Sequence, residues 1–204
     1  MNPIINWGKL AHIHTHKHEH EHDPIAILME EHRVIERAVA LLHKVAEKID
    51  EEVKVDAQVL SDLVDFIRNF ADRCHHGKEE KILFKTFSEK GIPVEGGPIG
   101  VMLLEHEEGR RAVKAMSDAA SRVKEGDWAG AKVFSANAKN YAQLLTQHIF
   151  KEDNILYPMG GRLLSEAERE DLVKRFEVVE KQDMGEGVHE KYIHLIEELE
   201  HKVV

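Results

Sequence analysis

A pair of helical segments occurs twice in this chain, and this repeat limits the possible folds more than any other feature. Residues 24–32 resemble residues 98–106 at an offset of 74, and residues 75–84 resemble residues 148–157 at an offset of 73. Each copy carries one histidine in its first segment and a His-x-x-x-Glu pattern in its second. We therefore expect two equivalent helical pairs related by a pseudo-twofold axis.

Apolar residues recur at helical spacing through most of the chain, and no segment outside the histidine-rich start alternates as a half-buried strand would. Asp23 can cap the first helix, with Pro24 at its first position. Four long helices joined by short turns pack most simply as an up-down-up-down antiparallel four-helix bundle, so the predicted fold is all-α. The expected helices cover residues 24–49, 56–88, 98–125 and 127–158.

A further helical hairpin is expected after the bundle. Ser165 and Glu168 form a capping box, and an apolar stripe with a spacing of about seven residues runs from Val188 to Leu199. This hairpin would pack on the bundle or on a second subunit, which would make a homodimer through the C-terminal helix. The predicted parts of the chain are a histidine-rich, disordered tail (1–22), the bundle (23–160) and a C-terminal helical extension (161–204).

The net charge and the cysteine content of the chain indicate which classes of partner and which cellular compartment to expect. The net charge of −10 argues against general affinity for nucleic acid or anionic lipid, which both require basic surfaces. No apolar run is long enough to cross a bilayer, and residues 1–11 lack the pattern of a secretory signal. A single cysteine, Cys74, fits a reducing compartment. We therefore expect a cytoplasmic protein without membrane or nucleic-acid partners.

The fifteen histidines fall into two populations. Six alternate with other residues between positions 12 and 22, where they could hold a transition metal loosely, form a purification tag or lie in a solvated tail. The other nine lie in predicted helix. Five of these have no counterpart at the matching repeat position and are interpreted as surface or packing residues: His43, His76, His189, His194 and His201.

The remaining four histidines and two glutamates should converge inside the bundle. Side chains four residues apart share one helix face, so each His-x-x-x-Glu directs an imidazole and a carboxylate to one point. Two buried carboxylates require cations to balance them. Because His75 aligns with His148, His75 is chosen over His76, which is rotated by about 100° together with Glu80. The predicted metal ligands are His32, His75, Glu79, His106, His148 and Glu152.

The donor set indicates a pair of iron ions. Six ligands exceed the needs of one tetrahedral zinc ion, and calcium and magnesium prefer oxygen donors throughout. Mixed imidazole and carboxylate ligands on facing helices suit iron, with manganese or zinc as substitutes. Each glutamate could bridge two ions, and histidines would complete each coordination sphere.

These residues resemble the hemerythrin family, and specifically the group of HHE cation-binding domain proteins, over about residues 23–160. The resemblance rests on the lone histidines and the His-x-x-x-Glu and His-x-x-x-Arg patterns. It implies an oxygen-reactive, non-haem di-iron centre that is bridged by the two carboxylates and an oxo or hydroxo group.

One position departs from the oxygen-carrying members of that family, which have a further histidine four residues after the third-helix histidine. Here that residue is Arg110, and its counterpart in the first copy is Glu36. Glu36 could be an additional metal ligand, or Glu36 and Arg110 could pair across the bundle beside the site or at the polar end of its core. A guanidinium near the metals could stabilise bound peroxide or another anion.

Tyr141 and Cys74 lie close to predicted ligands along the chain. Tyr141 lies two turns before His148 and could donate a hydrogen bond or a proton near the metals, or could be an ordinary core tyrosine. Together with Arg110 it is the candidate for a catalytic role. Cys74 adjoins His75 and is interpreted as a buried or boundary thiol, with a redox role as the alternative.

Four functions remain open at this point. The centre could bind or sense oxygen, nitric oxide or peroxide; it could be an enzyme that decomposes peroxide or nitric oxide; it could store or donate iron; or it could be a structural metal site in an interaction module. Whether the chain is an enzyme is not decided by these residues.

Overall fold

The computed structural model describes residues 23–183, 185 and 187–203, and every regular element among them is a helix. The histidine-rich tail of residues 1–22 lies outside this range, as do residues 184, 186 and 204. The all-α fold class is thereby confirmed.

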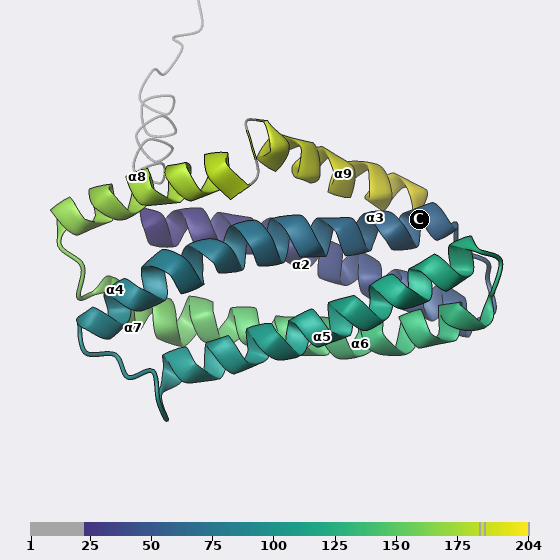
Figure 1. The fold of residues 1–204 in the computed structure, drawn as a ribbon, viewed down its shortest axis with the longest axis horizontal. Coiled ribbons are helices and arrows are strands. Elements are labelled where there is room, and N and C mark those ends of the chain that lie inside the picture. Colours follow the sequence, from purple (N-terminus) through teal and green to yellow (C-terminus); the bar gives the residue numbers. More distant parts are fainter. Residues whose placement is uncertain (1–22, 184, 186, 204) are drawn as a thin grey trace, which may run out of the picture.

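Two uninterrupted α-helices and two composite ones form the bundle (Figure 1). The first and third are α2 (Pro24–Asp50) and α5 (Pro98–Lys124). The second consists of α3 (Ala57–Phe66), the π-helices η1 (Ile67–His76) and η2 (Glu79–Leu83), and α4 (Phe84–Glu89). The fourth consists of α6 (Ala129–Lys151), the π-helix η3 (Glu152–Leu156) and α7 (Tyr157–Gly161).

Local sequence explains where these helices begin and end. The Asp23 carboxylate accepts a hydrogen bond from the backbone N–H of Ile25 at 2.9 Å, and Pro24 occupies the first turn, as predicted. Gly126 follows α5 with φ +94°, a left-handed conformation that glycine adopts without strain. Asp127 accepts a hydrogen bond from the N–H of Ala129 at 3.1 Å and so caps the first turn of α6.

The C-terminal hairpin consists of α8 (Glu166–Asp183) and α9 (Val188–Lys202), and both helices lie along one side of the bundle (Figure 1). They pack on α2 and on the composite second helix. Of the two predicted arrangements, the structure therefore contains the one in which the hairpin covers its own bundle. Dimerisation stays a prediction.

The core consists of two hydrophobic clusters with a polar layer between them. One cluster contains the C-terminal two thirds of α2, most of α3, and the facing parts of α5, α6 and α9. The other contains Leu28, Phe87, Met102 and Leu156, with Leu172 and Phe176 of α8 packed against them. The candidate site lies in the layer between these clusters.

In the described part of the chain, no helix combines the length and the apolar character required to cross a membrane.

Candidate metal centre

All four helices of the bundle contribute to a buried cluster of histidines and glutamates. The lone histidines come from α2 and α5, and the remaining ligand candidates come from η1, α6 and the first residues of η2 and η3. Each of these side chains has a relative exposure of 5% or less: His32, His75, His76, Glu79, His106, His148 and Glu152. The six predicted ligands are thus brought together, with one addition.

The donor atoms form two groups, and within each group all of them lie within 4.8 Å of one another. The first group, which we call the two-histidine half, consists of His32, His75, Glu79 and Glu152. The second, the three-histidine half, consists of His76, Glu79, His106 and His148. Glu79 belongs to both groups, as expected of a residue that connects two ions.

Each glutamate also lies between histidines of the two halves. Oε2 of Glu152 is 3.3 Å from Nε2 of His32 and 3.2 Å from Nε2 of His148. Oε2 of Glu79 is 3.8 Å from Nε2 of His75 and 3.4 Å from Nε2 of His106. Both carboxylates are therefore placed to bridge a pair of cations.

The imidazole spacing also fits metal coordination. The Nε2 atoms of His32 and His75 are 2.9 Å apart, and those of His106 and His148 are 3.0 Å apart. Two ligands at adjacent octahedral positions lie about 3 Å apart when the metal–nitrogen bonds are about 2.1 Å long.

The side-chain oxygens of Glu79 and Glu152 indicate most directly whether the cluster could hold cations. Oε2 of Glu79 and both side-chain oxygens of Glu152 are buried and have no hydrogen-bond partner. Burial and the negative charge of Glu79 raise the pKa of Glu152 well above its usual range. Buried carboxylates without donors are costly, and cations between them would remove that cost. The residues present therefore fit a pair of metal ions.

The Nε2 atoms of the four histidines that were predicted as ligands face one another and the glutamates. The Nδ1 atom of every clustered histidine, His76 included, contacts an acidic side chain behind it, which orients the ring. A carboxylate can only accept, so each Nδ1 carries a hydrogen, and in the neutral form of each ring Nε2 keeps the lone pair that a metal ion would bind. The contacts are His32 to Asp153 (2.7 Å), His75 to Glu31 (2.9 Å), His76 to Asp72 (3.4 Å), His106 to Glu80 (2.7 Å) and His148 to Glu105 (2.9 Å).

Basic side chains in turn hold these acids. Arg33 pairs with Asp153, Lys78 with Glu31, and Lys151 with Glu105. Arg110 contacts both Asp72 and Glu80, with N–O distances of 2.8 and 2.7 Å. Although burial acts in the opposite direction, Lys78 and the two contacting histidines, His189 and His75, hold the pKa of Glu31 well below its usual range.

The structure departs from the sequence interpretation most clearly at His76. We expected His76 on the surface or in packing contacts, because its counterpart in the second copy is Ile149. It is not on the surface: it is buried, and its ring packs on that of His106 with centroids 3.8 Å apart. What was not expected is that its donor atom also belongs to the three-histidine half. The cause is local: η1 is a π-helix, whereas the matching stretch of α6 is α-helical. A π-helix has more residues per turn, so adjacent side chains are separated by a smaller angle, and His75 and His76 both face inward.

Neither interpretation of Glu36 matches the structure. Glu36 is 45% exposed and pairs with Arg33 at 3.2 Å, so it lies outside the cluster and does not contact Arg110. Arg110 is instead bound to Asp72, Glu80 and Glu107. The guanidinium thus orients the carboxylates behind His76 and His106.

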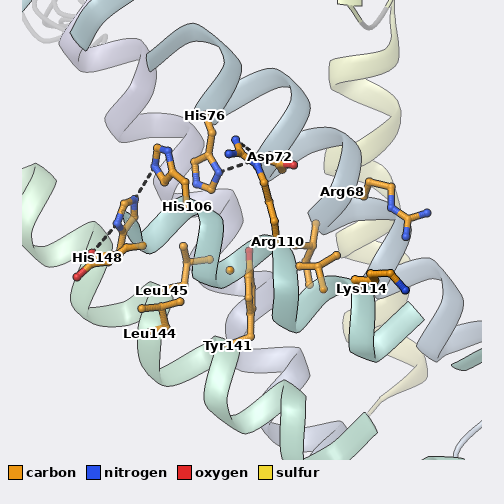
Figure 2. Close-up of a pocket in the computed structure, with 14 residues that line it drawn as sticks. Arg68, Asp72, His76, His106, Arg110, Lys114, Tyr141, Leu144, Leu145 and His148 are labelled. Atoms are coloured by element: carbon orange, nitrogen blue, oxygen red, sulfur yellow. Dashed lines mark hydrogen bonds and ion pairs between the residues drawn. The ribbon is translucent and has the colours of Figure 1, made fainter. Parts of the chain in front are cut away.

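Two tyrosines lie near the cluster. Tyr157 was not among the predicted site residues, yet its buried hydroxyl donates to Oε1 of Glu79 at 2.6 Å and leaves Oε2 facing the imidazoles. Tyr141 lines a cavity beside the three-histidine half together with Arg110 (Figure 2). Burial raises the pKa of both phenols, so both are hydrogen-bond donors at neutral pH.

Cys74 is buried, and burial raises the pKa of its thiol to about 12, so the thiol is protonated at neutral pH. It lies with Glu31 and Glu180 in a third group of potential metal ligands. The ammonium of Lys78 pairs with both of these carboxylates and supplies the positive charge there.

Comparison with known proteins agrees with this geometry. The model of the hemerythrin HHE cation binding domain family matches residues 23–160. The proteins Rv1995 of Mycobacterium tuberculosis and Mb2018 of Mycobacterium bovis are each 21% identical to this chain over 173 residues. The aligned region covers 85% of this chain and 67% of each relative, and both relatives are described only as uncharacterized.

Proposed function

The chain belongs to the hemerythrin HHE cation-binding domain family, and on this premise we propose that its central cluster binds two iron ions that in turn bind oxygen, nitric oxide or peroxide. The observation that carries the proposal is the position of Glu79 and Glu152, whose unpartnered oxygens lie between histidines of both halves. This arrangement supports a pair of ions rather than a single one.

The proposed assignment follows the two groups of donor atoms. His32 and His75 would hold one ion, His76, His106 and His148 the other, and Glu79 and Glu152 would contact both. Mixed nitrogen and oxygen donors on facing helices favour iron, although manganese or zinc could substitute.

The bound iron would supply reversible redox chemistry and affinity for small oxygen- or nitrogen-containing ligands. The chain's own residues determine the surroundings. Carboxylates fix each imidazole through Nδ1 and increase its basicity, and hydrophobic clusters border the layer on both sides. Tyr157 holds one oxygen of Glu79 and thereby fixes the orientation of that carboxylate.

A second candidate is an enzyme that decomposes peroxide or nitric oxide. The cavity that reaches His76, His106 and His148 favours it, since a substrate needs access to the reacting centre. Storage or donation of iron is less favoured by the complete burial of the ligands, which would slow release.

The test is anaerobic loading of the full chain with ferrous iron, followed by exposure to oxygen, nitric oxide or peroxide. We expect about two iron ions per chain and an absorption change with at least one of these ligands. Reversal on removal of the ligand indicates binding or sensing, whereas consumption over many cycles indicates an enzyme. Fewer than one tightly bound iron per chain, or two ions that respond to none of the three ligands, would contradict the proposal.

A further inference from the structure

A cavity of about 120 Å³ adjoins the three-histidine half of the metal centre. His76, His106 and His148 form its inner end. In Figure 2 the Tyr141 ring stands beside the cavity, and Arg68 and Lys114 extend on the side away from the histidines. The apolar part of the wall consists of Ile67, Val113, Leu144 and Leu145.

This cavity is larger than a diatomic ligand requires. A water molecule needs roughly 10–15 Å³ of such volume, and a cavity of about 150 Å³ in another protein binds benzene. The space beside the histidines therefore suits an organic molecule close to the size of one six-membered ring. Its apolar walls favour a ligand whose body is hydrocarbon.

The Tyr141 hydroxyl supplies a recognition group within the cavity. The residue is only 2% exposed, and no hydrogen bond joins its hydroxyl to any residue that the structure describes. The hydroxyl is not one of the fully buried side-chain atoms that lack a partner, so its accessible surface lies at the cavity. Tyr141 is therefore available to donate to a polar atom of a ligand.

Arg68 supplies a positive charge on the outer side. It donates to the neutral hydroxyl of Ser117 at 3.0 Å and forms no ion pair within the described range of residues. Lys114, by contrast, pairs with Asp118 at 2.8 Å, and Arg110 is held by carboxylates. Arg68 is thus the cation of this cavity that remains free to bind an anionic group.

We propose that this cavity binds a small organic anion, with its charged group at Arg68, its apolar body against Ile67, Leu144 and Leu145, and a hydrogen bond from Tyr141. This ligand class goes beyond the proposed function, because neither oxygen, nitric oxide nor peroxide has an apolar body. The site requires only residues of the chain, so it does not depend on the identity of the metal.

The experiment uses benzoate as a probe on the full chain, with and without iron, and measures binding by calorimetry and saturation-transfer NMR. Benzyl alcohol has the same ring without the charge, and inorganic phosphate has charge without the ring. We expect benzoate to bind more tightly than either. Equal affinity for benzyl alcohol would overturn the anionic assignment, and equal affinity for phosphate would overturn the organic one.

Variants then locate the site. Leu144→Trp should fill the cavity and abolish benzoate binding, and Arg68→Gln should weaken it about tenfold, which corresponds to about 1.4 kcal/mol. Arg175→Gln changes an exposed arginine on α8 and should have no effect. Circular dichroism checks that each variant is folded, and none of these residues is a proposed iron ligand, so iron content should stay at the wild-type value. Absence of benzoate binding, or binding that survives Leu144→Trp in a folded protein, would overturn the proposal.

Discussion

His76 is the one imidazole of the candidate metal centre that has no counterpart in the other copy of the repeat. The other four imidazoles, Glu79 and Glu152 are in register, and so are the acids that orient those four imidazoles: Glu31 and Glu105 precede the lone histidines, and Glu80 and Asp153 follow Glu79 and Glu152. His76 corresponds to Ile149 and adds a third imidazole to one half. The proposed ions would therefore have unequal numbers of protein nitrogens.

The first prediction concerns this histidine. His76→Ala should lower tightly bound iron from about two to about one per chain, because the three-histidine half loses a ligand and metal affinity depends on the complete donor set. His43→Ala, which removes an exposed histidine of α2, should leave the iron content unchanged. Metal analysis after exhaustive dialysis measures both. If His76→Ala keeps two ions while His75→Ala does not, His76 is not a ligand, and the sequence-based choice between the adjacent histidines was right.

Much of this residue-level arrangement could be predicted from the sequence. The repeat alone brought six buried donors together, and its acidic positions, also in register, could have identified four of the five carboxylates that contact Nδ1 atoms. The hydrogen bond from Tyr157 to Glu79 could not be predicted from the repeat, because the counterpart of Tyr157 is Phe84, which has no hydroxyl. Arg110 and Glu36 could not be placed, because the partners of long surface side chains depend on three-dimensional proximity.

At the level of elements, the helix boundaries followed from caps and glycines, but the type of helix did not. The sequence interpretation assumed about 100° between successive residues, the value for an α-helix. Residues 67–76 are a π-helix, and Glu79 and Glu152 begin further π-helical segments. Such segments are rare and often lie at functional sites. Apolar periodicity averages over several turns and does not reveal them, so His76, which has no counterpart in the second copy, was interpreted as a surface or packing residue.

The second prediction concerns the start of α2. Asp23 caps this helix and also accepts a hydrogen bond from Arg169 of α8 at 2.8 Å. Asp23→Ala should lower the free energy of unfolding by about 1 kcal/mol, measured by urea denaturation of the iron-loaded protein, because the cap is lost. Asp23→Ser keeps a capping oxygen and should recover most of this loss. Equal destabilisation by both substitutions would mean that the contact with Arg169, rather than the cap, is responsible.

At the level of the whole molecule, the C-terminal hairpin is connected to the metal layer through Glu31. This carboxylate contacts His75, and it also contacts Lys78 and, at 3.4 Å from Nε2, His189 of α9. Lys78 is fully buried and lies 3.5 Å from Glu180 of α8. One buried ionic network therefore joins both helices of the hairpin to an imidazole of the site.

The third prediction is a pH dependence of hairpin packing. Although burial acts in the opposite direction, the hydrogen bond to Glu31 and its charge raise the pKa of His189 above its usual value of about 6.5. The folded state thus binds this proton more tightly than the unfolded state. The resulting stabilisation is complete below the unfolded pKa and is lost as pH rises through the folded one. Amide hydrogen exchange in α9, corrected for intrinsic rates, should therefore become faster above about pH 6.5.

Two variants distinguish the effect of the titration of His189 from that of other titrating groups in the hairpin. His189→Gln should make the protection of α9 nearly independent of pH in this range, because the titrating group is gone. His194→Gln is the matched control, since His194 is 74% exposed and its ion-pair partner among the described residues is its helix neighbour Glu197 at 3.0 Å. It should retain the wild-type pH dependence. If His189→Gln and wild type lose protection equally as pH rises, another titrating group sets the pH dependence. If wild type shows no pH dependence, the hairpin is held by contacts that do not titrate, such as that of Tyr192 with Phe66.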